Sequence, residues 1–325
     1  RDYDEAGSVN PNAVAAVSVN PDSELIPTTR ANGVLLCNSH PSGGLVSGQG
    51  SVMQLDGWTY EEMTVLESAG VVMNWPRMLP IQAWWMEDSV EEQLKQRNEQ
   101  LRGVEIFFAQ ANRYRLAKEA GNADYDAKLE AILPVLAGEK PLLMVANEQQ
   151  QIQLAVAFAE RHGLKMVLMG GRDAGKCADL LKAADVPVVL IGTQRSPGAR
   201  DNGYDTAYKL PADLHEAGVK FAIASDRRSS FARNLPYHAG AAIAFGLPED
   251  VALQAITSAP ADILGVGDRV GTLEVGKDAT LFVADGDIFE TPTQVTAAWI
   301  AGAPVDLSSR HTMLNDKYKQ RYGQE

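Results

Sequence analysis

Residues 219–226 read Val-Lys-Phe-Ala-Ile-Ala-Ser-Asp, a short apolar run that ends in a hydroxyl group and a carboxylate. Its nearly continuous apolar character, with β-branched and aromatic residues, predicts a strand buried on both faces, as in a parallel sheet covered by helices. Asp226 would then lie at the carboxyl end of that strand, where open α/β sheets and (β/α)8 barrels carry their functional groups. The alternative is that Asp226 caps the segment that follows, residues 227–233.

The order of the pieces after this strand carries a family resemblance. Residues 234–246 predict a helix of small residues, and residues 247–264 a second helix, broken at Pro260. Gly271-Thr-Leu-Glu-Val-Gly-Lys-Asp-Ala follows, about 45 residues after Asp226. This order resembles the end of the amidohydrolase superfamily, in its imidazolonepropionase and prolidase-like branch. There a final barrel strand ends in Ser-Asp, and a Gly-x-Leu-x-x-Gly-Lys-Asp-Ala hairpin leads into a small β-sandwich.

The composition limits the partners and the class of protein. The chain has 325 residues and a net charge of −13, which suits a large core and disfavours nucleic acid or an anionic membrane surface as a partner. No window approaches the roughly 20 apolar residues that span a bilayer. Cys37 and Cys177 show no zinc-site spacing, so we expect free thiols and not a disulfide.

The beginning of the chain leaves the compartment open. Arg1 is not a methionine, and residues 1–21 have neither the charged nor the apolar region of a signal peptide. Both a mature exported protein and the second piece of a cut chain could begin in this way. An exported or periplasmic location is favoured over a cytoplasmic one.

Most of the chain alternates between expected helices and strands, which predicts a parallel sheet. The expected helices are residues 21–31, 58–69, 89–121, 125–137, 149–161, 174–184 and 211–217. The expected strands are residues 34–38, 71–74, 142–146, 166–169, 188–191 and 219–226, two short of an eight-stranded barrel, and no fourth strand is evident after residue 74. Residues 39–54 are rich in glycine and serine and are interpreted as a loop that holds His40.

The resemblance implies a (β/α)8 barrel of amidohydrolase type over residues 1–265, part of a composite β-sandwich over residues 266–310, and a C-terminal tail over residues 311–325. In the family the first barrel strand carries His-x-His, which would lie upstream of Arg1. We therefore expect a companion N-terminal polypeptide from the same gene to supply that strand and the other half of the sandwich. A homo-oligomer is a further possibility.

The resemblance also assigns a metal site. Asp226 would bind a divalent metal ion, zinc as first choice, and accept a proton from metal-bound water. Two further histidines of the family correspond here to Asn147 and Gly170, neither of which replaces an imidazole. No lysine stands at a strand end to be carbamylated, so at most one ion is expected.

Five other residues are candidates for binding substrate. His40 and His238 belong to segments at the expected barrel mouth and could act as acid, base or hydrogen-bond donor. Gln49 ends a Gly-Gln loop like that of related sequences. Asn147 and Arg172 follow the strands at residues 142–146 and 166–169.

Two functions remain open. The first is a hydrolase of C–N bonds in cyclic amides or in acylated, dipeptide-like amino acids, which uses metal-activated water. The second is a binding protein or pseudo-enzyme that kept the barrel and lost the metal. Ser225-Asp226 supports the first function, and the residues Asn147 and Gly170 support the second.

Overall fold

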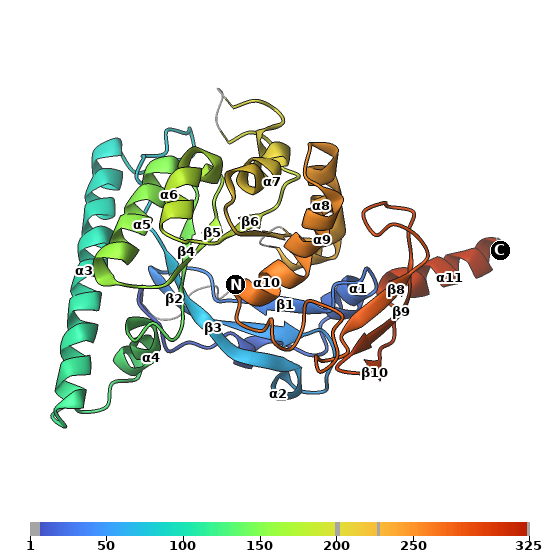
Figure 1. The fold of residues 1–325 in the computed structure, drawn as a ribbon, viewed down its shortest axis with the longest axis horizontal. Helices are drawn as coiled ribbons and strands as arrows, with labels where there is room; N and C mark the ends of the chain where they lie inside the picture. The colour runs from blue at the N-terminus through green and yellow to red at the C-terminus, as the bar shows by residue number, and fades with distance from the viewer. Residues whose placement is uncertain (1–6, 199–201, 226–227, 324–325) are drawn as a thin grey trace.

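The computed structural model describes residues 7–198, 202–225 and 228–323 of the chain (Figure 1). Within them a seven-stranded sheet has the order β1-β2-β3-β4-β5-β6-β7, and a three-stranded sheet has the order β10-β9-β8. Helices cover the seven-stranded sheet, with the long α3 along one side of the molecule, while α11 extends away from the opposite side (Figure 1). The fold is therefore of the α/β class, with a curled, half-barrel sheet.

The large sheet has an antiparallel half and a parallel half. β1 pairs with β2 and β2 with β3 in antiparallel fashion, whereas every pair from β3 to β7 is parallel. The strands are β1 (Leu36–Ser39), β2 (Val46–Gln54), β3 (Thr64–Asn74), β4 (Leu142–Ala146), β5 (Met166–Gly170), β6 (Val188–Ile191) and β7 (Phe221–Ala224). The expected all-parallel alternation thus holds only from β3 onward.

The predicted loop at residues 39–54 was wrong, because most of it is the strand β2. Its glycines allow close packing and do not mark a loop: a Cβ on Gly48 would lie 2.5 Å from the carbonyl oxygen of Ala13, and one on Gly50 would lie 3.3 Å from Leu143 Cδ1. β2 adds a seventh strand to the six that the sequence predicted for this sheet. The segment between β3 and β4 contains the helices α3 and α4 and no strand. β3 and β4 pair directly with one another, so no further strand lies between them in the sheet.

The predicted helix at residues 58–69 was also largely wrong. Thr59 does cap a helix, since its side chain accepts the Glu62 N–H, but α2 spans only Tyr60–Met63. From Thr64 onward the chain is β3, whose residues from Ser68 to Met73 are all buried. Pairing on both sides of the strand outweighs the local helical tendency of its first residues.

The remaining helices lie where the sequence predicted them. α3 (Val90–Glu119) begins with the predicted capping box of Ser89 and Glu92. The others are α1 (Leu25–Arg30), α4 (Ala127–Leu136), α5 (Gln149–His162), α6 (Ala178–Ala183), α7 (Thr206–Ala217), α8 (Leu235–Ala244), α9 (Glu249–Ile256), α10 (Ser258–Ile263) and α11 (Arg310–Tyr322). Short 3-10 turns lie at Ala16–Ser18, Ala174–Cys177 and Ser229–Asn234. The break between α9 and α10 falls at Thr257 and not at Pro260, which lies in the first turn of α10, where a proline is tolerated.

Both faces of the parallel strands are buried, as the apolar runs predicted. One face, with Leu142, Met144 and Leu168, packs against Phe108 of α3 and Phe158 of α5. The other face forms a separate cluster that α10 covers, made of Val72, Leu143, Val167, Met169, Val189 and Ala222 with Ala259 and Ile263 packed on it. The parallel half is therefore a layered core with its strand ends held in fixed positions.

The sheet order begins at β1 and ends at β7, so the strands of the described residues do not close an eight-stranded barrel. The C-terminal sheet consists of β8 (Leu281–Ala284), β9 (Val295–Ile300) and β10 (Ala303–Pro304). Its apolar face packs on Leu35, and no second layer of a sandwich is seen in the part of the chain that is described. The expected C-terminal tail contains α11, which has no buried residue.

Two further expectations concern single features. Cys37 and Cys177 are free in the described part of the chain, as predicted. Among the helices described, none combines the length and the apolar character needed to cross a membrane.

Candidate functional site at the carboxyl ends of the parallel strands

Asp226, the residue expected to bind metal and accept a proton, lies outside the described residues, so its role stays a prediction. β7, which precedes it, ends at Ala224 and is parallel to β6. The predicted strand before Asp226 is therefore confirmed.

Asn147 and Gly170 meet at the ends of β4 and β5. Ala146 and Gly170 are register partners, and Asn147 follows directly. The Asn147 N–H donates to Gln151 Oε1 at 2.8 Å, and the Asn147 carbonyl accepts the Asp173 N–H at 2.9 Å. Gly170 has φ = 104°, and the Asn147 amide occupies the space beside its Cα. Asn147 and Gly170 are thus neighbours at the adjacent ends of β4 and β5.

A cluster of charged side chains surrounds Glu148, which is 9 % exposed. Glu148 Oε1 accepts a hydrogen bond from Arg77, which follows β3, and lies 3.8 Å from Arg172 Nη2. Glu148 Oε2 is buried and has no hydrogen-bond partner among the described residues. Arg172 therefore shares one carboxylate oxygen with Arg77 and has only a long ion pair.

Arg195, which follows β6, adds a third guanidinium to this edge. Burial and, second, the positive charge of Arg172 lower the pKa of Arg195, and Asp173 partly opposes this effect. Its Nε donates to the Gly192 carbonyl at 3.2 Å. The edge between β5 and β6 therefore carries two cations that act on one another.

His238 comes from α8 and is 5 % exposed, so its ring is held inside the protein. The backbone N–H groups of Thr193 and Gln194 donate to His238 Nδ1 at 3.2 and 3.3 Å. The Thr193 hydroxyl donates to the His238 carbonyl at 2.7 Å, which ties α8 to the loop after β6. Because Nδ1 accepts backbone protons, the neutral imidazole carries its own proton on Nε2.

His40 and Gln49 belong to the antiparallel half of the sheet. His40 follows β1, and its Nδ1 lies 3.0 Å from the Pro41 carbonyl oxygen. Gln49, within β2, donates through Nε2 to the Pro11 carbonyl at 3.1 Å. Within the described residues neither side chain is hydrogen-bonded to the groups around Glu148 and His238. Asn147, Arg172 and the loop that holds His238 thus follow the neighbouring strands β4, β5 and β6, whereas His40 and Gln49 belong to the antiparallel half.

The described residues do not fit the metal site of the resemblance. None of their histidine, cysteine, aspartate and glutamate side chains come together in a group of three or more that could hold an ion. Gly170 has no side chain, and Asn147 offers an amide where a histidine would bind. We therefore derive no catalytic step through a metal ion.

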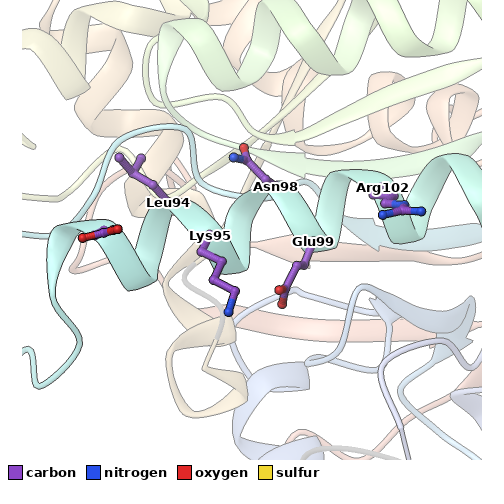
Figure 2. Close-up of a pocket in the computed structure, with 6 residues that line it drawn as sticks. Leu94, Lys95, Asn98, Glu99 and Arg102 are labelled. Atoms are coloured by element: carbon purple, nitrogen blue, oxygen red, sulfur yellow. The ribbon is translucent and has the colours of Figure 1, made fainter.

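One groove on the surface lies away from the strand ends. It encloses about 430 Å³ along α3 and is lined by Glu91, Leu94, Lys95, Asn98, Glu99 and Arg102 (Figure 2). All six residues belong to one helix, and none of them follows a strand. The candidate site consequently rests on the side chains at the carboxyl ends and not on this groove.

Sequence reasoning missed four residues of this edge: Arg77, Glu148, Thr193 and Arg195. Each lies in a loop directly after β3, β4 or β6, which is the signal that could have identified them. Their pairing depends on how far the side chains reach, which the sequence pattern does not show.

A half-barrel with polar groups at the carboxyl ends of its parallel strands is an architecture typical of enzymes. Comparison with known proteins narrows this class. The Amidohydrolase family model matches residues 199–318. Amidohydrolase TasK of Hapsidospora irregularis is 34 % identical over 103 residues, which are 30 % of this chain and 10 % of that protein. The imidazolonepropionase of Mesorhizobium japonicum is 32 % identical over 149 residues, which are 45 % of this chain and 35 % of that protein.

The fold agrees with these matches. The crystal structure of an amidohydrolase from Thermotoga maritima superposes with a TM-score of 0.80 at 26 % identity, over 94 % of this chain and 80 % of that one. The chain thus resembles amidohydrolases, in sequence over residues 199–318 and in fold over most of its length. The aligned segments span only about a tenth and a third of the two relatives, TasK and the imidazolonepropionase.

Proposed function

We propose that the chain hydrolyses C–N bonds in small cyclic amides or in acylated, dipeptide-like amino acids. The observation that supports this proposal is the position of polar side chains after the neighbouring parallel strands β4, β5 and β6: Asn147 and Arg172, and the loop after β6 that holds His238 of α8. Similarity to an imidazolonepropionase supports it, because that name describes a hydrolase of a cyclic amide.

In this proposal the side chains divide between positioning and proton transfer. Asp226 accepts the proton of the attacking water, and His238 supplies a fixed imidazole whose neutral form is protonated on Nε2. Asn147 and Arg172 contact the substrate, as do His40 and Gln49 if the substrate reaches the antiparallel half. Burial of His238 keeps its ring in one orientation, which favours a reproducible geometry for catalysis.

Members of the amidohydrolase family generally use divalent metal ions. An ion such as zinc would lower the pKa of bound water and polarise a carbonyl group. The described residues do not supply such a ligand set, so we propose no more than one ion, with Asp226 as its ligand from this chain.

We also propose that a companion polypeptide pairs with the edges of the large sheet. The outer edges of β1 and β7 have no partner strand among the described residues, and unpaired edges favour association with further strands. The mass of the purified native assembly, measured by mass spectrometry, tests this: a monomer of this chain alone would contradict both the companion and a homo-oligomer.

The function itself is tested by product analysis in 18O-labelled water. Purified protein is incubated, with and without added zinc, with N-acetylated amino acids, dipeptides and cyclic amides. Hydrolysis predicts one labelled oxygen in the carboxylate that is released. If no substrate is cleaved under any condition although the protein is folded, the proposal fails and the binding-protein alternative is favoured.

A further inference from the structure

The carboxyl edge of the sheet carries positive charge in a protein whose net charge is −13. Arg77, Arg172 and Arg195 come from three separate loops, after β3, β5 and β6. Glu148 is the carboxylate within ion-pair distance of the first two. Within the described residues, three guanidinium groups thus follow the parallel strands together with the carboxylates of Glu148 and Asp173.

Arg195 has no counter-charge of its own in the described part of the chain. Its Nε is fixed by the Gly192 carbonyl, and its two terminal nitrogens have no hydrogen-bond partner among the described residues. The residue is only partly exposed. A partly buried cation without a partner is costly, so the arrangement points to an anion from outside the chain.

Arg172 is in a similar position. The Glu148 oxygen that lies 3.8 Å from Arg172 already accepts a hydrogen bond from Arg77. The neighbouring Asp173 does not serve either guanidinium, because it accepts the Gln149 N–H at 3.2 Å and pairs with Lys176 at 3.4 Å. Among the described residues, neither Arg172 nor Arg195 therefore has a carboxylate that pairs with it alone.

We propose that Arg172 and Arg195 together bind an oxyanion group, a carboxylate or a phosphate, carried by the substrate. Planar guanidinium groups match the two-oxygen geometry of both anions. The inference rests on the proposed function only in assigning the anion to a substrate. It identifies Arg195, which lies outside the predicted site, as a residue that determines specificity.

Binding is measured directly by calorimetry at low ionic strength, so that the test does not depend on activity. The ligands are N-acetylglycine, its neutral counterpart N-acetylglycinamide, and inorganic phosphate. N-acetylglycine, phosphate or both should bind, and the neutral amide should bind at least about 10-fold more weakly than N-acetylglycine if the carboxylate is recognised. Preference for N-acetylglycine identifies the anion as a carboxylate, and preference for phosphate identifies it as a phosphate ester.

Variants locate the site. Arg172→Gln and Arg195→Gln should each weaken anion binding by about 10- to 100-fold, because each removes a charge-assisted contact. Arg195→Lys keeps the charge but loses the planar fork and should give a smaller loss. Arg113→Gln, on the exposed side of α3, is the matched control and should change nothing. Urea unfolding of each variant separates loss of binding from loss of fold.

Two results would overturn the inference. The first is that neither N-acetylglycine nor phosphate binds at 10 mM, roughly the weak limit for a specific contact. The second is that the Arg195→Gln variant binds these anions as tightly as the native protein does. Failure of the inference can be told apart from that of the proposed function. Hydrolysis of neutral and anionic amides at equal rates, unchanged in Arg195→Gln, would refute the anion site alone. Anion binding that is lost in Arg195→Gln without any hydrolysis would refute the proposed function alone.

Discussion

Replacing Gly170 by alanine should destabilise the protein by roughly 2–5 kcal/mol, the sum of two costs. Gly170 has φ = 104°, a left-handed conformation that costs an alanine about 1–2 kcal/mol. The new Cβ would also lie 2.7 Å from Asn147 Oδ1 and 3.2 Å from Asn147 Cγ. Relief of this contact requires movement of a half-buried side chain, for which overpacking in cores gives about 1–3 kcal/mol.

Urea unfolding followed by circular dichroism measures this loss, and Gly138→Ala is the matched control. Gly138 has φ = 70°, and a Cβ there would meet nothing within 4 Å, so only the backbone cost of about 1–2 kcal/mol applies. The double variant Asn147→Ala/Gly170→Ala should recover the steric part and approach the control. The coupling between the two substitutions should then be about 1–3 kcal/mol.

Equal losses for Gly170→Ala and Gly138→Ala, or additive effects of the two substitutions at positions 147 and 170, would refute this reasoning. The result also bears on the metal site. Gly170→His would place an imidazole at a position where the resemblance implies a metal ligand, but through the same obstructed Cβ. We expect that variant to gain stability from zinc only if Asn147 is shortened as well.

Four further predictions follow from single features. Asp226→Asn should change the unfolding free energy by less than about 1 kcal/mol yet abolish amide hydrolysis, and persistent hydrolysis at the native rate would count against its role. Metal analysis of the purified protein should find at most one divalent ion per chain; two equivalents would contradict the proposed site. Ser89→Ala should cost about 1 kcal/mol in urea unfolding by removing the capping box of α3, and no loss would mean that this end of the helix frays. Burial raises the pKa of Cys37 to about 11, so iodoacetamide at pH 8 should alkylate it far more slowly in the native than in the unfolded protein, as mass spectrometry can show.

The parallel half of the fold could be predicted because each of its strands is a short apolar run between helices. The bounds expected for residues 142–146 and 188–191 are those of β4 and β6. Burial on both faces leaves little choice of residue, so the sequence signal is strong there. For the same reason the positions after these strands, such as Asn147 and Arg172, could be identified as candidates for the site.

The strand β2 and the first part of β3 could not be predicted because their close contacts demand glycine. Gly70 of β3 shows the reason: a Cβ there would lie 2.5 Å from the Pro141 carbonyl oxygen, so the strand needs a residue that resembles a loop signal. The register shifts between β2 and β3 further disturb the alternation that identifies a strand. In this part of the chain the local composition, which is rich in glycine, indicates a loop, whereas the tertiary packing requires a strand.

The charges of the site could not be predicted for a different reason. Arg195 and Glu148 have ordinary sequence surroundings, and their importance comes from which partners they have in space. Glu148 is shared by two arginines, whereas Arg195 has none of the described carboxylates within ion-pair distance. A sequence pattern records neither fact, since both depend on the relative positions of three loops.

The N-terminal segment limits where a companion strand could pair. Val9 and Val14 form parallel bridges with Val46 and Gln49, in the part of β2 that β1 does not reach. The chain thus covers this portion of β2 itself, with Gln49 held there by the Pro11 carbonyl. Among the described strands of the large sheet, the open pairing positions for the proposed companion polypeptide are therefore the outer edges of β1 and β7.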